Sequence, residues 1–246
     1  MRIPRIFSDQ DLECGQVVSL NEFASGHVCR VLRMKPGREL LLFNGRGGEF
    51  SAVLREADSK KAVVELRDFD PVDRESNLEI HLGLALSRGD RFDWALQKSV
   101  ELGVTEITPL VCERSDRIAD PKRMKRKMDH WQKLMISASE QCGRTGLAKI
   151  SEPKDCRAWC TEDSAGEGYF FAPSTQSLKD SLKELKVSPE KVRLAIGPEG
   201  GFALQEEEQF LEQGFKAVSI GPRILRTETA PVAVISLFQY MFGDIS

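Results

Sequence analysis

Short apolar runs separated by turn residues dominate the first 75 residues, a pattern typical of β-strands. The dipeptide Asn44-Gly45 favours a tight turn between antiparallel strands. Residues 27–34 predict a short helix, and residues 68–77, which are charged and contain Pro71, predict a linker. Strands are expected at residues 39–43, 49–54 and 61–66. This region therefore predicts a small β-barrel-like unit.

From residue 78 onward, strand-like and helix-like segments alternate. The pattern predicts strands at residues 78–86, 104–112, 169–172, 192–196 and 216–220. Helices are expected near residues 92–103, 124–142, 178–185, 204–213 and 229–242. Repeated strand–helix units imply an α/β fold with a mostly parallel sheet, helices on both faces and ligands at the carboxyl ends of the strands.

Two of these helices have informative apolar faces. Residues 124–142 place Met, Trp and Ala side chains on one stripe, which predicts burial in the core rather than contact with a cofactor. Residues 230–242 are apolar on nearly all sides, so this helix must be buried in a core or in a subunit interface. With a rise of about 1.5 Å per residue, it is too short to span a bilayer.

The chain has 246 residues, of which 41% are hydrophobic, enough for one large domain or two small ones. Its apolar runs are too short for a membrane span, and residues 1–7 lack the apolar region of a secretory signal. The six cysteines form no CxxC pair, and the three histidines are far apart in the sequence. We therefore expect reduced thiols, a cytoplasmic location and no metal site.

Charge is unevenly distributed along the chain. The total of 35 basic and 38 acidic residues gives a net charge of −3, which argues against a polycationic surface. Residues 114–149, however, carry ten basic and four acidic side chains, with the basic ones concentrated at residues 122–127. This basic run indicates either a solvated helix face or a footprint for phosphate groups.

The first loop with a functional signal is Ile-Gly-Pro-Glu-Gly-Gly-Phe at residues 196–202, between a predicted strand and a predicted helix. Its glycines let a ligand approach the backbone and leave N–H groups free to bind it. The loop lacks the lysine and the glycine spacing of phosphate-binding loops, and the Glu199 carboxylate would repel a phosphate. A neutral or cationic ligand fits better, and a tight turn without a ligand is the remaining alternative.

The second such loop is Ile-Gly-Pro-Arg-Ile-Leu-Arg-Thr-Glu-Thr-Ala-Pro at residues 220–231, after the next predicted strand. Thr227 or Thr229 can cap the last helix, and Pro231 suits its first turn. Capping does not explain Arg223 and Arg226 beside an apolar Ile-Leu pair. Two Gly-Pro loops at the ends of successive strands predict one shared crevice.

These two loops resemble the cofactor loops of the SPOUT methyltransferases, and more narrowly those of the RsmE type, which methylates N3 of a uridine in bacterial 16S rRNA. Residues 1–6, 27–34, 98–104 and 140–144 are also similar to that family, so the resemblance covers nearly the whole chain. It implies a PUA-like β-barrel RNA-binding domain at residues 1–73. It also implies a SPOUT α/β methyltransferase domain with a C-terminal trefoil knot at residues 74–246.

The resemblance further implies a homodimer formed through the last helix, with both subunits completing the active site, and S-adenosylmethionine as cofactor. Ala203 departs from the family, whose members more often carry Ser or Thr as this helix cap; the loss affects stability by about 1 kcal/mol. By motif, the cofactor contacts correspond to Ala172, Pro173, Ile196, Gly197, Glu199, Gly200, Ile220, Gly221, Leu225, Arg226 and Ala230.

Methylation of uracil N3 requires the base and the methyl donor in line, and the negative charge left by the N3 proton must be stabilised. Arg226 is the candidate catalytic residue, as a cation aimed at the charge on the carbonyl oxygens. The loops contain no histidine, so no general base is assigned. Glu199 and Glu228 are candidates for that role, although structural roles are favoured for both. The uridine would leave its stack to react.

The expected partner is 16S rRNA within the assembled small ribosomal subunit. Contacts with the RNA are expected from Arg2, Arg5, Arg30, Arg33, Lys122, Arg123, Arg126 and Arg144. Two other classes stay open, a non-catalytic RNA-binding or ribosome-assembly factor and a nucleotide-binding enzyme of Rossmann type. The two Gly-Pro loops argue against the first class, and the missing GxGxxG fingerprint argues against the second.

Overall fold

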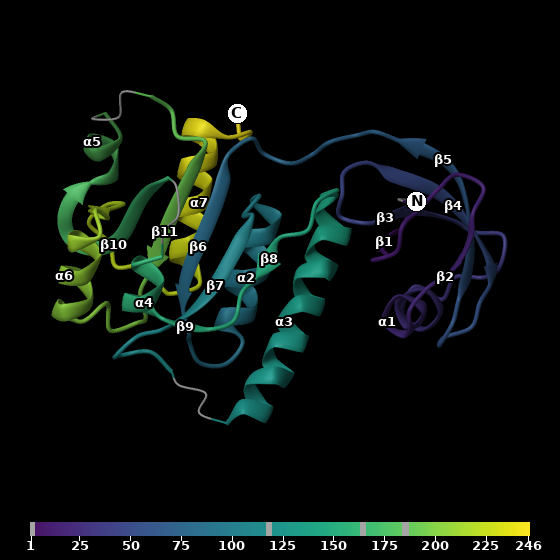
Figure 1. Ribbon diagram of the computed structural model, residues 1–246, viewed down its shortest axis with the longest axis horizontal. Helices are drawn as coiled ribbons and strands as arrows, with labels where there is room; N and C mark the ends of the chain where they lie inside the picture. The colour runs from purple at the N-terminus through teal and green to yellow at the C-terminus, as the bar shows by residue number, and fades with distance from the viewer. Residues whose placement is uncertain (1–2, 117–119, 163–165, 184–186) are drawn as a thin grey trace. The chain divides into compact units, whose positions relative to one another are not determined.

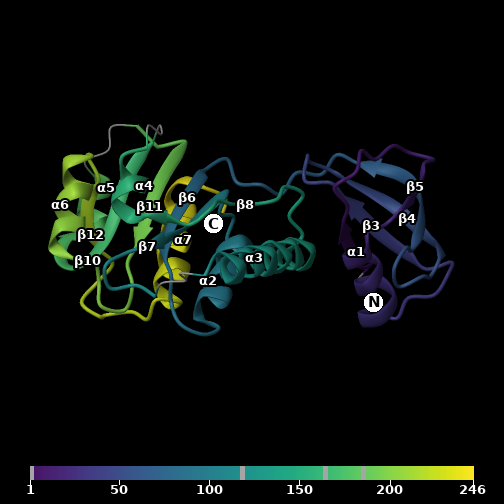
Figure 2. The ribbon, with the colours of Figure 1, turned by 60° about the horizontal axis from the view of Figure 1, so that its bottom comes forward.

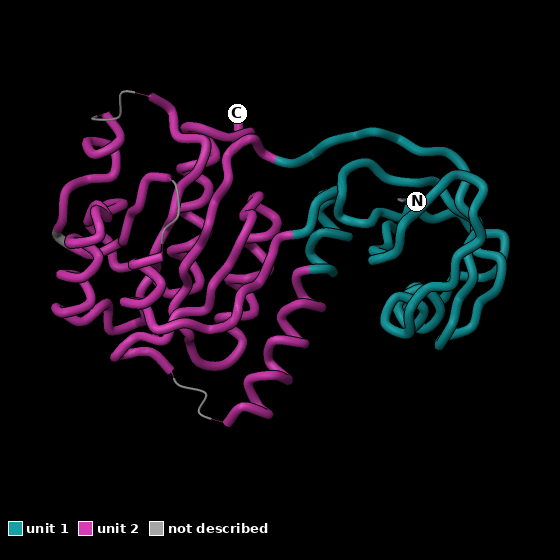
Figure 3. Tube along the Cα trace, in the orientation of Figure 1, with its two compact units in different colours: residues 1–75, 136–147 teal, residues 76–135, 148–246 magenta. Residues whose placement is uncertain are grey.

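The computed structural model describes residues 3–116, 120–162, 166–183 and 187–246. The chain divides into two compact units, residues 1–75 with 136–147 and residues 76–135 with 148–246 (Figure 3). Within the described parts of the chain, we find no helix that combines the length and the apolar character needed to cross a membrane.

The first unit is built on a curled five-stranded sheet in the order β1-β3-β4-β5-β2 (Figure 1). Strand β1 runs parallel to β3, and the other neighbours are antiparallel. Ile6, Leu42 and Leu54 belong to the apolar core of this unit. Its elements are β1 Arg5–Phe7, β2 Val17–Ser19, α1 Glu22–Gly26, a π-helical turn His27–Val31, β3 Glu39–Phe43, β4 Glu49–Glu56 and β5 Val63–Asp70.

The predicted strands and helical turn of this unit are confirmed, with one correction. Strand β5 continues to Asp70, into the predicted linker, and Phe69 packs there against Phe50 of β4 with ring centroids 4.8 Å apart. The sequence did not predict strands β1 and β2 or helix α1. With three to five residues each, they are too short to show a periodic pattern of apolar and polar residues.

The second unit is built on a seven-stranded sheet in the order β12-β10-β11-β6-β7-β8, with β9 also paired to β7. Every pairing is parallel, as predicted. The strands are β6 Glu79–Ala85, β7 Glu106–Val111, β8 Lys149–Ile150, β9 Lys154–Asp155, β10 Glu167–Ser177, β11 Lys191–Ile196 and β12 Lys216–Ser219. The helices are α2 Arg91–Glu101, α3 Pro121–Cys142, α4 Cys156–Cys160, α5 Leu178–Lys183, α6 Leu204–Glu212 and α7 Thr229–Phe242.

Successive residues of β10 point to opposite faces of this sheet and meet different helices. Tyr169 contacts Phe238 of α7 at a ring-centroid distance of 5.2 Å, whereas Phe170 stacks on Phe210 of α6 at 5.3 Å. Helices α2 and α7 contact each other on the first face, and α4 and α6 contact each other on the second (Figure 2). The prediction of helices on both faces is therefore confirmed.

Helix α3 buries the apolar stripe that its sequence predicts. Trp131, Met135 and Ala138 are each 1% exposed. Trp131 packs against Phe92 of α2, and its indole N–H donates to the Asp93 carboxylate at 2.9 Å. The stripe is therefore part of the core, as expected.

Candidate active site

Three neighbouring strands, β12, β10 and β11, end at the same edge of the parallel sheet. The register of β10 against β12 shifts between Phe171 and Gln176, so the first expected cofactor loop lies in an irregular part of β10 rather than after it. The segments that leave β11 and β12 are the two Gly-Pro loops. Together the three segments line a cavity of about 510 Å³, a size typical of small-molecule sites.

Two glycines are required by the shape of these loops. Gly221 has φ +128°, which an L side chain rarely adopts. At Gly197 a Cβ atom would lie 3.2 Å from the Phe202 ring, so the two sides of that loop pack closely. The glycines therefore let both loops fold tightly around the cavity.

The lining of the cavity is mostly apolar, with Ile220, Leu225 and Val234 among its residues. Among the described residues, its charged side chains are Glu199 and Arg223. Such a surface fits a ligand with a large organic part that carries both positive and negative charge, which describes S-adenosylmethionine.

Nine of the expected cofactor residues line this cavity, and two do not. Gly200 lies against the Arg114 side chain, and Arg226 lines a neighbouring cavity. Val218, Ser219 and Val234 line the first cavity without having been singled out from the sequence, because strand and helix residues of this kind look like ordinary core. The nine residues are Ala172, Pro173, Ile196, Gly197, Glu199, Ile220, Gly221, Leu225 and Ala230.

The neighbouring cavity, of about 790 Å³, shares Glu199 with the first. Glu199 forms an ion pair with Arg91 at the start of α2. The Arg226 guanidinium lies 3.9 Å from the Glu228 carboxylate and its side chain is 79% exposed. Arg226 is therefore accessible beside the first cavity.

The segment that follows β7 holds the first Gly-Pro loop from outside. The Arg114 guanidinium donates to the backbone carbonyls of Gly200 at 2.9 Å and Phe202 at 3.2 Å. The Glu206 carboxylate accepts the backbone N–H groups of Ala203 at 2.7 Å and Glu113 at 2.8 Å. We call these four hydrogen bonds the loop clamp. Arg114 was missed in the sequence, although its position just beyond the end of a parallel strand is a usable signal.

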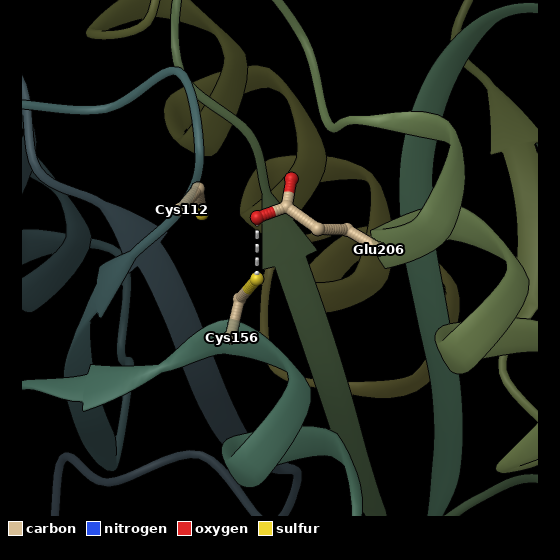
Figure 4. Close-up of side chains that lie close together, drawn as sticks. All are labelled: Cys112, Cys156 and Glu206. Atoms are coloured by element: carbon tan, nitrogen blue, oxygen red, sulfur yellow. Dashed lines mark hydrogen bonds between the residues drawn. The ribbon is translucent and has the colours of Figure 1, made fainter.

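A buried thiol completes the partners of Glu206. Cys156 donates to the Glu206 carboxylate at 3.1 Å, and Cys112 lies beside them (Figure 4). The pKa of the Cys156 thiol is raised, mainly by contact with the Cys112 thiol and secondly by burial, so Cys156 remains a protonated donor. The three residues offer metal-ligand atoms within 4.8 Å of one another, a grouping that their sequence spacing hides. Because backbone and thiol donors already occupy the carboxylate, we assign the cluster to support of the loop.

The residues expected to contact RNA fall into two groups. Arg5 is 7% exposed, and its guanidinium donates to the Glu49 carboxylate and to the carbonyls of Ser139 and Arg144. Arg144 is 6% exposed and pairs with the Glu75 carboxylate. These two side chains are therefore engaged inside the protein and are not available to phosphates. Arg2 lies outside the described residues, and the exposed group is Arg30, Arg33, Lys122, Arg123 and Arg126.

Two family models and several known proteins are similar to this chain. Residues 74–239 match a family described as an RNA methyltransferase domain, and residues 24–67 match an RNA methyltransferase PUA domain. The ribosomal RNA small subunit methyltransferase E of Buchnera aphidicola subsp. Schizaphis graminum is 37% identical, covering 100% of this chain and 99% of the relative. The protein of the same name from Bacillus subtilis is 27% identical, covering 94% and 93%.

Two solved structures are similar over the full length of both chains. A Legionella pneumophila methyltransferase in complex with the bound cofactor SAM has a TM-score of 0.94 and 38% identity, covering 100% of each chain. A Neisseria gonorrhoeae ribosomal RNA small subunit methyltransferase E bound to S-adenosyl methionine has a TM-score of 0.89 and 36% identity, again covering 100% of each. These matches confirm the expected SPOUT α/β fold with an N-terminal PUA domain. The chain belongs to the ribosomal RNA small subunit methyltransferase E family of RNA methyltransferases.

Proposed function

We propose that this protein transfers a methyl group from S-adenosylmethionine to N3 of a uridine in 16S rRNA, within the assembled small ribosomal subunit and hence in the cytoplasm. The cavity at the ends of β10, β11 and β12 carries the proposal, because a protein that only bound RNA would not need it. Its mixed-charge, mostly apolar lining also suits this cofactor better than a nucleotide of Rossmann enzymes.

When bound, the cofactor supplies an electrophilic methyl group on a sulfonium. The residues of this chain hold it in place. The backbone of the two Gly-Pro loops and the apolar side chains Ile220 and Leu225 enclose the ligand, and Glu199 offers a carboxylate to its positive charge. Positioning of this kind supplies much of the rate enhancement in a two-substrate transfer.

We assign Arg226 to the uracil. Its guanidinium lies in the cavity that shares Glu199 with the cofactor cavity, so it can reach a base presented to the methyl group. A fixed cation stabilises the negative charge that spreads to the uracil carbonyl oxygens as N3 loses its proton. This role needs no histidine and leaves the proton acceptor unassigned.

The test of the proposed function is incubation of the protein with S-adenosylmethionine and small ribosomal subunits that lack the modification, followed by mass mapping of the modified nucleotides. We expect one N3-methyluridine in 16S rRNA. Calorimetric titration with S-adenosylmethionine, ATP and NAD separates the three protein classes, since a binding factor takes none of them and a Rossmann enzyme takes a nucleotide.

We further propose that residues 1–73 act as the RNA-binding domain and residues 74–246 as the methyltransferase domain. Within the first, Arg30 and Arg33 are the exposed basic side chains that the family resemblance points to. Within the second, Lys122, Arg123 and Arg126 form an exposed basic run at the start of α3. We assign both sets to RNA phosphates.

We also propose that the protein is a homodimer that pairs through α7. One side of this helix is in the core, where Val234, Ile235 and Phe238 are fully buried. Its other side exposes Leu237, Tyr240 and Met241 by 41, 65 and 51%. Apolar side chains of this size gathered on one helix face are typical of a subunit interface.

Replacement Arg226→Ala should lower kcat for methyl transfer by about 10²–10³-fold, because one preorganised charge at the transition state is lost. The measurement is transfer of labelled methyl groups to small subunits at saturating cofactor. The variant should stay folded and dimeric by circular dichroism and light scattering. Wild-type turnover would remove Arg226 from the mechanism.

Replacement Arg114→Ala should weaken S-adenosylmethionine binding about tenfold, because two charge-assisted hydrogen bonds of the loop clamp are lost. Calorimetry gives the dissociation constant. Arg157→Ala is a matched control, since Arg157 is also a partly exposed arginine paired with a carboxylate but lies on α4. Equal affinities of the two variants for S-adenosylmethionine would show that the clamp does not hold the loop in its binding conformation.

Replacement of Lys122, Arg123 and Arg126 together by Gln should flatten the salt dependence of RNA binding. The plot of log K against log salt has a negative slope, and each lost phosphate contact reduces the magnitude of that slope by about 0.7–0.9. Filter binding to 16S rRNA over a range of salt concentrations measures that slope. The same triple change at Lys179, Lys183 and Lys191 is the control, and an unaltered slope in the first variant would refute the assignment.

Replacement Leu237→Glu should convert the dimer to a monomer, because the charge cannot be buried in an apolar interface. Multi-angle light scattering should give twice the 27.6 kDa chain mass for the wild type and the single mass for the variant. Leu211→Glu on α6, where the side chain is 53% exposed, should leave the mass at that of the wild type. A dimeric Leu237→Glu variant would place the interface elsewhere.

A further inference from the structure

We propose that the cavity lined by Arg88, Arg91 and Trp94 receives the target nucleotide, with its base stacked on the Trp94 indole. The inference rests on the proposed function and names the acceptor side of the same site. None of these three residues lies in a cofactor loop or in the basic run of α3. They come from the loop after β6 and from the first turn of α2.

The position of this cavity suits an acceptor. Glu199 lines both it and the cofactor cavity, so the two share a wall. Arg226, the residue assigned to the uracil oxygens, lines it as well. At about 790 Å³ it is large enough for a nucleotide. A base held here is next to the methyl donor.

Trp94 is the strongest chemical indication of a base. The opposite side of α2 supplies the core with Phe92, Leu96 and Val100, which are at most 2% exposed. Trp94 contributes little to that core and is 43% exposed. An exposed indole in a cavity is a surface on which an unstacked base can lie, as in proteins that bind flipped or single-stranded nucleotides.

The arginines supply the phosphate chemistry. The side chains of Arg88 and Arg91 are 88 and 44% exposed, and each is held by a carboxylate, Asp116 at 2.8 Å for Arg88 and Glu199 for Arg91. Exposed ion pairs of this kind are weak and leave guanidinium N–H groups free for a phosphate. The ion pairs therefore orient the two guanidinium groups and still leave N–H groups of each one available to a phosphate.

The carboxylates also shape specificity. Asp90, Glu199 and Glu228 line the same cavity as the arginines. The site is thus not simply cationic, and it offers both acceptors and donors. The uracil edge presents an N–H between two carbonyl oxygens, so a carboxylate and a guanidinium side by side match it.

The test compares Trp94→Ala, Trp94→Phe and Arg91→Ala with Arg157→Ala as matched control. Methyl transfer to small subunits is measured at saturating S-adenosylmethionine, and calorimetry measures cofactor binding. Trp94→Ala and Arg91→Ala should each lower kcat/KM for the subunit about tenfold or more. Trp94→Phe, which keeps a stacking ring, and the control should stay within about threefold of the wild type. Cofactor affinity should be unchanged in both Trp94 variants and in the control. An unaltered kcat/KM in Trp94→Ala, or an equal loss of cofactor affinity, would overturn the inference.

Fluorescence gives a second readout that does not depend on turnover. The chain has three tryptophans, and Trp131 and Trp159 are at most 1% exposed, so Trp94 is the one that a ligand can reach. Uridine monophosphate should quench its emission saturably in the cofactor-bound protein, and Trp94→Phe should lose the response. Quenching that does not saturate would refute a nucleotide site. If the wild type methylates no subunit, the proposed function fails, while saturable quenching would still support a nucleotide at Trp94.

Discussion

The structure of the second unit depends on one constraint, the parallel pairing that places β10 between β11 and β12. Strands β11 and β12 follow each other in the sequence, yet the chain passes over β10 to connect them. Because all three strands run in the same direction, the segments that leave them meet at one edge. The cofactor cavity, the start of α6 and the start of α7 all follow from that meeting.

Glycine-rich loops at such an edge have no rigidity of their own, since each glycine adds backbone freedom. Rigidity comes instead from the end of β7, through Arg114 and the backbone of Glu113. Glu206 provides one half of a capping box for α6, because its carboxylate accepts the backbone N–H of Ala203. The Cys156 thiol donates a further hydrogen bond to that carboxylate, and contact with the Cys112 thiol, together with burial, raises its pKa.

The sequence was informative where the relevant residues are close together in the chain. The Gly-Pro loops follow predicted strands, so one shared crevice was expected, and nine of the eleven residues that the family resemblance assigns to the cofactor line one cavity. Residues that reach the site from other strand ends, such as Arg91, Trp94 and Arg114, could not, because only the sheet order brings them there. The prediction that Arg5 and Arg144 contact RNA rested on their charge. Their partners Glu49 and Glu75 are distant in the sequence, so the sequence gives no sign that these arginines are paired inside the protein. A basic residue can be assigned to RNA only once it is known whether a carboxylate inside the protein already pairs with it.

The same reasoning explains how a chain with a net charge of −3 can act on RNA. Most of its arginines near the cavities are paired with carboxylates. These arginines therefore add little to the long-range electrostatic field, but the pairing holds their guanidinium groups in position. In the proposed function, the exposed basic run at the start of α3 attracts the phosphate backbone without selecting a base. In this proposal, attraction and selection are carried by different surfaces of the second unit. An overall positive charge would strengthen the first at the expense of the second, because it would hold any RNA equally well.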